Sequence, residues 1–370
     1  MRRIIVYLVA LYCAGLIALR DVKGSTGSGL YQPFERFGLY DPYSKTHQAL
    51  TDYHYADLGT FGWFSDGQTE YPNCPGRLSF PGGHQATRTI TVGQTGQSPP
   101  ETAVEQLLDR HPDWPDDAFT WQIGSRPGWD GYTTQPGQFY PDRYQTESYV
   151  RDFECWRRQI QRADPGARIM SGQVYWLVTE TSGNDTRGFL EETIREYYTQ
   201  FGTAMPIDVF NLGLFINGSS PDFVGDLTSA VVEFRRWLAN VPLADGVYHD
   251  YSDSEVWLGA FGFSKPVFGM NVERFMTGSV QWLMGTEPGG NFDLRYGLGS
   301  DEHRLVQRWA WYASRDTTPG LRACNLFTEQ GDLTDLGRCY AALIPDTCPE
   351  PMSLFIFMSG ALCLPIPRRR

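Results

Sequence analysis

The sequence lacks the signatures of several common functional sites. Its seven cysteines include no Cys-x-x-Cys pair and do not cluster with the six histidines, so a structural zinc site is not expected. No glycine-rich phosphate loop follows an early strand, and we therefore expect no nucleotide cofactor. Acidic residues outnumber basic ones by 43 to 31, with no internal basic stretch. A nucleic-acid partner is not expected, because phosphate binding requires a basic surface.

What the chain does have is enough apolar and aromatic residues for a large core. Of its 370 residues 41% are hydrophobic and 20% are charged, which fits one barrel-sized domain or two smaller ones. It contains 11 Trp, 20 Tyr and 22 Phe. Such residues fill cores, but aromatic faces also stack on the flat C–H faces of sugar rings.

The first 28 residues have the pattern of a signal peptide or an N-terminal anchor. Arg2-Arg3 forms a basic start, and an apolar run from Ile4 to Leu19 follows it. The sequence therefore predicts export, with residues 29–345 as the folded domain.

The last residues, 346–370, resemble the PEP-CTERM sorting signal of exported bacterial proteins. The triplet Pro349-Glu350-Pro351 precedes a short apolar segment, and three arginines end the chain. The apolar segment is too short for a comfortable independent membrane span. The resemblance implies C-terminal sorting and processing machinery as a partner, transient membrane association through the termini, and a final location at the cell surface or in the extracellular matrix.

Strand-like runs alternate with helical patterns along the domain. The helical patterns cover 44–53, 100–110, 144–163, 188–201, 226–239, 272–284 and 336–343, and a hairpin-like piece covers 324–333. Alternation of this kind predicts a parallel sheet. We expect a single (β/α)8 TIM barrel with a short C-terminal hairpin and helix. Its eight predicted strands are 36–40, 57–64, 87–92, 119–124, 168–176, 208–216, 255–261 and 305–312.

Two motifs carry a resemblance to bacterial (β/α)8 glycoside hydrolase-like proteins of the large retaining clan. The first is Trp121-Gln122-Ile123-Gly124-Ser125-Arg126-Pro127, and the second is Trp257-Leu258-Gly259-Ala260-Phe261-Gly262. In that clan, Gly-Asn-Glu-Pro and Thr-Glu-Phe-Gly stand at these places. The resemblance implies an acid/base position at the end of strand four and a nucleophile position at the end of strand seven.

The chain departs from the clan at both positions. Arg126 and Ala260 replace the two glutamates, and Asn211 is followed by Leu212-Gly213 where the clan has Asn-Ile-His. A retaining glycosidase needs two carboxyl groups about 5 Å apart. Alanine cannot act as a nucleophile, and arginine does not release its proton near neutral pH. We therefore predict no catalytic residue at these degenerate positions.

Aromatic and polar residues remain at the predicted strand ends. On the last strand Gln307, Trp309 and Trp311 share one face by the two-residue period, and Ala310 on the other face is small enough to meet a helix. Indole faces and amides suit saccharide binding, although the same residues could only fill the barrel. The candidate ligand-binding residues are Ser125, Trp129, Asp130, Trp176, Asn211, Gln307, Trp309 and Trp311.

Three functions remain open at this point. A non-catalytic barrel could bind a polysaccharide or serve as a surface or matrix component. An active glycoside hydrolase could use displaced carboxylates such as Asp130 and Glu180, if they lie roughly 6.5–9.5 Å apart around a water. A purely structural role without a ligand is the third.

The resemblance also implies one disulfide. The similar proteins have small residues at the positions of Cys324 and Cys339, so two cysteines that occur together there suggest a pair. Closing a loop of this length would contribute about 3 kcal/mol. The pairing of Cys74, Cys155 and Cys348 stays open.

Overall fold

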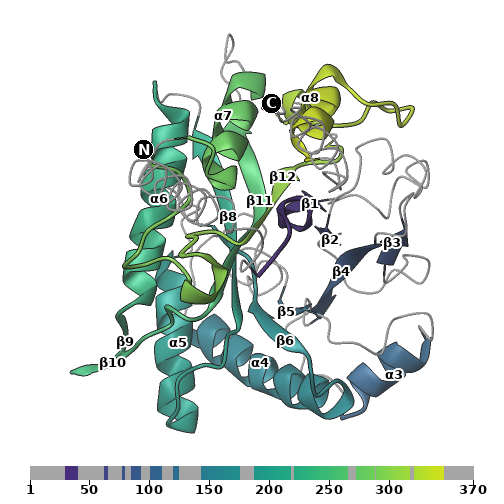
Figure 1. Cartoon of the computed structure of the whole chain (residues 1–370). Helices are drawn as coiled ribbons and strands as arrows, with labels where there is room; N and C mark the ends of the chain where they lie inside the picture. The colour runs from purple at the N-terminus through teal and green to yellow at the C-terminus, as the bar shows by residue number, and fades with distance from the viewer. Residues whose placement is uncertain are drawn as a thin grey trace, which may run out of the picture.

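The fold is taken from a computed structural model of the 370-residue chain (Figure 1). The residues it describes are 30–40, 62–65, 77–79, 85–92, 101–110, 120–124, 143–175, 187–217, 221–265, 272–287, 289–316 and 321–345.

Eight parallel strands close into a barrel in chain order. Each strand pairs in parallel with its neighbour, and the last pairs with the first, with Phe37 beside Trp309. The predicted parallel barrel is therefore confirmed. Its strands are β1 (Phe37–Tyr40), β2 (Trp63–Ser65), β4 (Gln85–Val92), β5 (Thr120–Ile123), β6 (Arg168–Ser171), β8 (Val209–Asn217), β11 (Glu255–Lys265) and β12 (Arg308–Tyr312).

Helices lie on the outside of the barrel and alternate with the strands (Figure 1). Contacts join α3 to α4, α4 to α5, α6 to α7 and α7 to α8. Most of the chain in the connections after β1 and β2, including the helix predicted at 44–53, lies outside the described residues. The described helices are α3 (Ala103–Arg110), α4 (Arg143–Ala163), α5 (Arg187–Phe201), α6 (Phe223–Leu238), α7 (Val272–Met284) and α8 (Asp335–Leu343).

Helix α6 shows how the sequence builds this outer layer. Asp222 caps its N-terminus, where the carboxylate accepts a hydrogen bond from the Gly225 N–H at 3.0 Å. Apolar residues three or four positions apart then form one buried face, which includes Leu227, Val231 and Phe234. That face packs against the barrel as part of the main hydrophobic core. Within the described residues, no helix combines the length and the apolar character that crossing a bilayer requires.

Several short elements lie outside the eight barrel strands and the helices around them. The hairpin of β9 (Val241–Ala244) and β10 (Val247–His249) precedes β11, and β3 (Arg77–Ser79) pairs antiparallel with β4. The predicted C-terminal hairpin is reduced to one antiparallel bridge between Phe327 and Leu333, and α8 follows it as predicted. The remaining elements are β7 (Val174–Tyr175) and the 3-10 turns η1 (Pro33–Arg36), η2 (Gly299–Asp301) and η3 (Arg322–Cys324).

Candidate functional site

The barrel interior is filled by a second, smaller hydrophobic cluster. We call the end where the strands begin the floor and the end where they finish the mouth. A filled interior means that a TIM barrel is a packed core rather than a pore, so ligands bind at the mouth. The cluster consists of Tyr40, Trp63, Met170, Val209, Trp257, Ala260 and Ala310, with Tyr31, Phe215 and Tyr312 packed against it.

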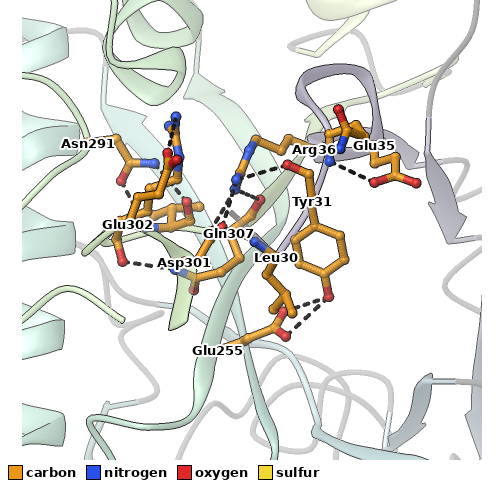
Figure 2. Close-up of polar contacts among 12 residues, drawn as sticks. Leu30, Tyr31, Glu35, Arg36, Glu255, Asn291, Asp301, Glu302 and Gln307 are labelled. Atoms are coloured by element: carbon orange, nitrogen blue, oxygen red, sulfur yellow. Dashed lines mark hydrogen bonds and ion pairs between the residues drawn. The ribbon is translucent and has the colours of Figure 1, made fainter. Parts of the chain in front are cut away.

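The floor holds a charged network around Glu255. Arg168 pairs with this carboxylate at 2.5 Å, and the Tyr31 hydroxyl donates to it at 2.8 Å (Figure 2). The Trp257 indole N–H donates to the same carboxylate at 2.6 Å. The Arg308 guanidinium lies 3.9 Å from the centre of the Tyr31 ring. Burial raises the pKa of Tyr31 to about 12, so the phenol stays protonated and remains a donor.

Residues 30–36, the N-terminal strap, lie across the floor. The Leu30 N–H donates to Asp301 at 2.7 Å, and Arg36 pairs with both oxygens of that carboxylate at 2.7 Å (Figure 2). Arg36 is 3% exposed and Asp301 is fully buried. Arg36 also donates to the Gln307 carbonyl at 3.1 Å. The strap therefore covers this end of the barrel with a satisfied buried ion pair.

Toward the mouth, Ala260 faces the barrel interior. The register of β11 against β8 shifts between Leu258 and Ala260, and Ala260 pairs with Gly213. The shift brings the Gly259 backbone against the Asn211 side chain, where a Cβ on Gly259 would lie 1.9 Å from Asn211 Oδ1. Ala260 is 1% exposed. A methyl group thus occupies the inward position near the end of β11.

A buried amide pair links β5 and β8 beside Ala260. Asn211 Nδ2 donates to Gln122 Oε1 at 2.8 Å, and Gln122 Nε2 donates to the Gly124 carbonyl at 2.9 Å. Asn211 Oδ1 is buried and accepts no hydrogen bond from the part of the chain that the structure describes. Because Asn211 is 4% exposed, it shapes the interior rather than presenting its amide on a surface.

Three aromatic rings from β1, β8 and β12 gather at the mouth. The Tyr312 ring lies 5.5 Å from Tyr40 and 5.1 Å from Phe215, centre to centre. The Tyr312 hydroxyl donates to Asp316 Oδ2 at 2.5 Å. We refer to Tyr40, Phe215 and Tyr312 as the mouth aromatics. They combine ring faces with a hydrogen-bonded polar edge, which is the chemistry that recognises sugars.

The structure corrects the predicted role of three residues on the last strand. Gln307, Trp309 and Trp311 do share one face, but that face points outward and all three are fully buried. Trp311 donates to the Cys324 carbonyl at 2.8 Å, and Gln307 accepts from Arg235 at 2.6 Å. They therefore do not line the mouth.

Ala310 is corrected at the same time, since it lies in the barrel interior instead of meeting a helix. The interior side of β12 holds Ala310 and Tyr312, and the bulky indoles lie in the layer between barrel and helices. The two-residue period identifies which residues share a face, but not which face is inside.

Several predicted site residues lie outside the described residues: Ser125, Arg126, Trp129, Asp130, Trp176 and Glu180. Of the remaining candidates, Asn211 and Ala260 lie on the adjacent strands β8 and β11, where Ala260 pairs with Gly213, two residues after Asn211. Sequence reasoning missed Gln122 and the mouth aromatics. The alternation of residues along each strand could have identified them. On β5, for example, Gln122 lies between Trp121 and Ile123, whose side chains point away from the barrel interior.

The predicted disulfide is wrong. Cys324 and Cys339 are both free thiols, as is Cys155. Cys339 lies on α8 and contacts the Thr277 hydroxyl of α7 at 3.6 Å. Cys324 is buried in the core beneath β12, and burial raises the pKa of its thiol to about 11. The two thiols therefore face different surroundings instead of one another.

Among the described residues, no group of three or more His, Cys, Asp or Glu could hold a metal ion.

Known structures share this barrel. An endo-β-1,3-glucanase of glycoside hydrolase family 128, subgroup II, from Sorangium cellulosum matches with a TM-score of 0.53 and 13% identity, over 85% of this chain and 100% of that one. A second subgroup II endo-β-1,3-glucanase, from Pseudomonas viridiflava, matches with a TM-score of 0.52 and 13% identity, over 84% and 98%. A subgroup VI exo-β-1,3-glucanase from Aureobasidium namibiae matches with a TM-score of 0.51 and 10% identity, over 84% and 97%.

No protein-family model matches the sequence, and no curated protein matches it. At 10–13% identity the structural matches show the fold alone. The chain has a glycoside hydrolase-like (β/α)8 barrel.

Proposed function

We propose that this chain is a glycoside hydrolase-like barrel that binds a glycan at its mouth without cleaving it. The observation that carries the proposal is Ala260. The resemblance of the sequence places a nucleophile there, and Ala260 is an inward-facing, buried residue on β11. Its methyl group cannot attack an anomeric carbon, so the covalent step of a retaining mechanism has no nucleophile at this position.

The other groups at the mouth support the same conclusion. Among the described residues that we place there, Asp316 is the one carboxylate, and its Oδ2 accepts the Tyr312 hydroxyl proton in a hydrogen bond. Double displacement needs two carboxyl groups that flank the scissile bond. Gln122 and Asn211 are neutral amides that bind one another.

Binding is assigned to the mouth aromatics. Tyr312 and Phe215 are half-buried, and each joins the interior cluster from the mouth side. Ring faces of this kind stack on sugars, and the Tyr312–Asp316 pair supplies a polar edge for hydroxyl groups. Because the three similar structures are β-1,3-glucanases, β-1,3-gluco-oligosaccharides are the first ligands to test.

Titration calorimetry with β-1,3-gluco-oligosaccharides tests this assignment. We expect the unmodified protein to bind, and Tyr312→Ala to weaken binding at least about tenfold, which corresponds to about 1.4 kcal/mol. Tyr248→Ala is the matched control, since it removes an exposed aromatic residue near the floor. Absence of binding to these and to other glycans on an array, or equal binding by Tyr312→Ala, would refute the assignment.

The proposal includes export to the cell surface or extracellular matrix. It rests on the signal-like residues 1–28 and on the PEP-CTERM-like residues 346–370, which both lie outside the described residues. The corresponding partners are the C-terminal sorting machinery and, transiently, the membrane. Fractionation of the producing cell, with mass spectrometry of the mature termini, tests it. A protein that stays in the cytoplasm with both termini intact would contradict it.

A further inference from the structure

A groove of about 590 Å³ lies at the floor end of the barrel, between the entrances of β6, β8 and β11. We call it the entrance groove. Leu30 is the exposed apolar residue of its wall, with Met205 and Ile207 buried behind it, and the carboxylates of Asp208, Asp250 and Asp253 line it. It lies at the opposite end of the strands from the mouth, so the glycan site does not account for it.

The carboxylates of the entrance groove carry uncompensated charge. Asp208, Asp250 and Asp253 are exposed, and none of them forms an ion pair with a described residue. Deeper in the groove, Arg168 neutralises Glu255 at 2.5 Å. The outer part of the groove therefore presents a negative field toward solvent.

Exposed apolar side chains gather at the same end of the barrel. Tyr248 is 57% exposed on the β9–β10 hairpin, which projects from the body of the barrel in Figure 1. Leu294 is 86% exposed in the segment before β12. The exposed large hydrophobic residues among those described lie before a barrel strand or at the end of a helix, with two of them on β10: Leu30, Phe201, Val247, Tyr248, Phe292 and Leu294. Apolar side chains concentrated at one end of a barrel indicate a contact surface.

The charges of the groove carboxylates, and the spacing between them, indicate which kind of partner can bind. The groove carboxylates do not converge, since no described group of three acidic, histidine or cysteine side chains could hold a metal ion. Anionic lipid and nucleic acid would be repelled by this face. A second copy of the chain, with a net charge of −12, would bring the same acidic face against itself. A cationic, partly apolar protein segment fits both the wall and the carboxylates.

We propose that the entrance groove binds a protein segment in which arginine or lysine alternates with aliphatic residues. The aliphatic side chains contact Leu30, which is 45% exposed at the groove, and the cations pair with Asp250 and Asp253 at the solvent edge. This inference goes beyond glycan binding and does not depend on it. Because the mouth lies at the other end, the barrel can bind a glycan and a basic protein at the same time. Such double binding would suit the proposed role as a surface or matrix component.

Fluorescence polarisation with the full chain and a labelled Leu-Arg-Leu-Arg-Leu-Arg peptide tests the proposal. We expect saturable binding that weakens as salt is raised, because the pairs are exposed. The double variant Asp250→Asn, Asp253→Asn should bind at least about tenfold more weakly. Asparagine at 250 still accepts the hydrogen bond from the Ser252 N–H, so the turn is preserved.

Two controls make the result specific. Asp109→Asn with Glu192→Gln removes the same number of exposed charges from α3 and α5, and should change the affinity less than about twofold. A peptide with citrulline in place of arginine keeps the shape and loses the charge, and should not bind. The proposal is overturned if the arginine peptide fails to bind below about 1 mM, if citrulline binds equally well, or if the two double variants behave alike.

Discussion

At the scale of single residues, the candidate site contains a close contact between the Asn211 side chain and the Gly259 backbone. Asn211 lies directly over Gly259, and its amide is fixed by Gln122 at 2.8 Å. A side chain at 259 has no room, because its Cβ would meet the Asn211 amide, which the hydrogen bond to Gln122 holds in place. The glycine therefore determines how the amide pair lies beside Ala260.

Gly259→Ala should lower the free energy of unfolding by about 1–3 kcal/mol, since the new Cβ would lie 1.9 Å from Asn211 Oδ1. Urea unfolding followed by circular dichroism measures the loss. Gly188→Ala in α5 is the matched control, because nothing lies within 4 Å of its new Cβ. That control should be neutral or stabilising by up to about 1 kcal/mol. Equal stability of Gly259→Ala and the unmodified protein would contradict the packing described.

At this scale, sequence reasoning identified an interior position of the barrel, but it could not decide which face of a strand points inward. The motif around Ala260 drew attention to a position that the structure places inside the barrel. Alternation placed Gln307, Trp309 and Trp311 on one face, but both faces of a barrel strand are buried. The pattern therefore could not tell the mouth from the helix-covered side.

At the scale of elements, one carboxylate of α4 forms a hydrogen bond to α5, beside the aromatic packing between the two helices. Glu154 accepts hydrogen bonds from Arg157 at 2.7 Å and from the Tyr197 hydroxyl of α5 at 2.6 Å. Burial alone would raise the pKa of Glu154, but the hydrogen bonds from Arg157, Tyr197 and Arg158 outweigh it and lower this pKa to about 2. The ionised form is thus specifically stabilised in the folded state.

Glu154→Gln should therefore destabilise the protein in a pH-dependent way. A lowered folded-state pKa adds stability above the unfolded pKa of about 4.5, and this stability is lost as the pH falls toward about 2. Urea unfolding at pH 7, 4 and 2.5 should show the difference from the unmodified protein shrinking with acidification. Glu191→Gln, which removes a surface pair with Arg195, should have a small effect throughout. A difference for Glu154→Gln that is constant with pH would refute this account.

Elements with strong periodicity were predictable, and short ones were not. Helix α7 was expected at 272–284 and occupies Val272–Met284, because its apolar spacing defines one continuous face. The β9–β10 hairpin and β3 were not predicted, since three or four residues are too few to establish a period. The disulfide prediction was wrong because helix packing, which the sequence does not reveal, directs the Cys339 thiol toward α7.

At the scale of the whole molecule, the N-terminal strap fastens the beginning of the domain to its last third. Arg36 and Asp301 are separated by 265 positions and form a buried, two-pronged pair. Tyr31 joins the same strap to Glu255 on β11. The floor of the barrel is thus covered by contacts that form only when the ends of the domain meet.

Arg36→Met should lower the free energy of unfolding by about 3–5 kcal/mol, because it leaves the Asp301 carboxylate buried without its cation. Arg338→Met is the matched control. It breaks an exposed pair with Asp335 and should cost less than about 1 kcal/mol. Thermal and urea unfolding of both variants provide the comparison. Similar losses for the two would show that the strap does not hold the floor.

The central claim is the proposal that this barrel, whose fold is similar to that of β-1,3-glucanases, does not hydrolyse glycosides. The most direct measurement is incubation of the purified protein with β-1,3-gluco-oligosaccharides in ¹⁸O-labelled water, followed by mass spectrometry. Every hydrolytic event places one labelled oxygen on a product, so even slow turnover accumulates. The account predicts no labelled product beyond the protein-free control. Labelled product in excess of the protein, lost in Asp130→Asn or Glu180→Gln, would contradict it.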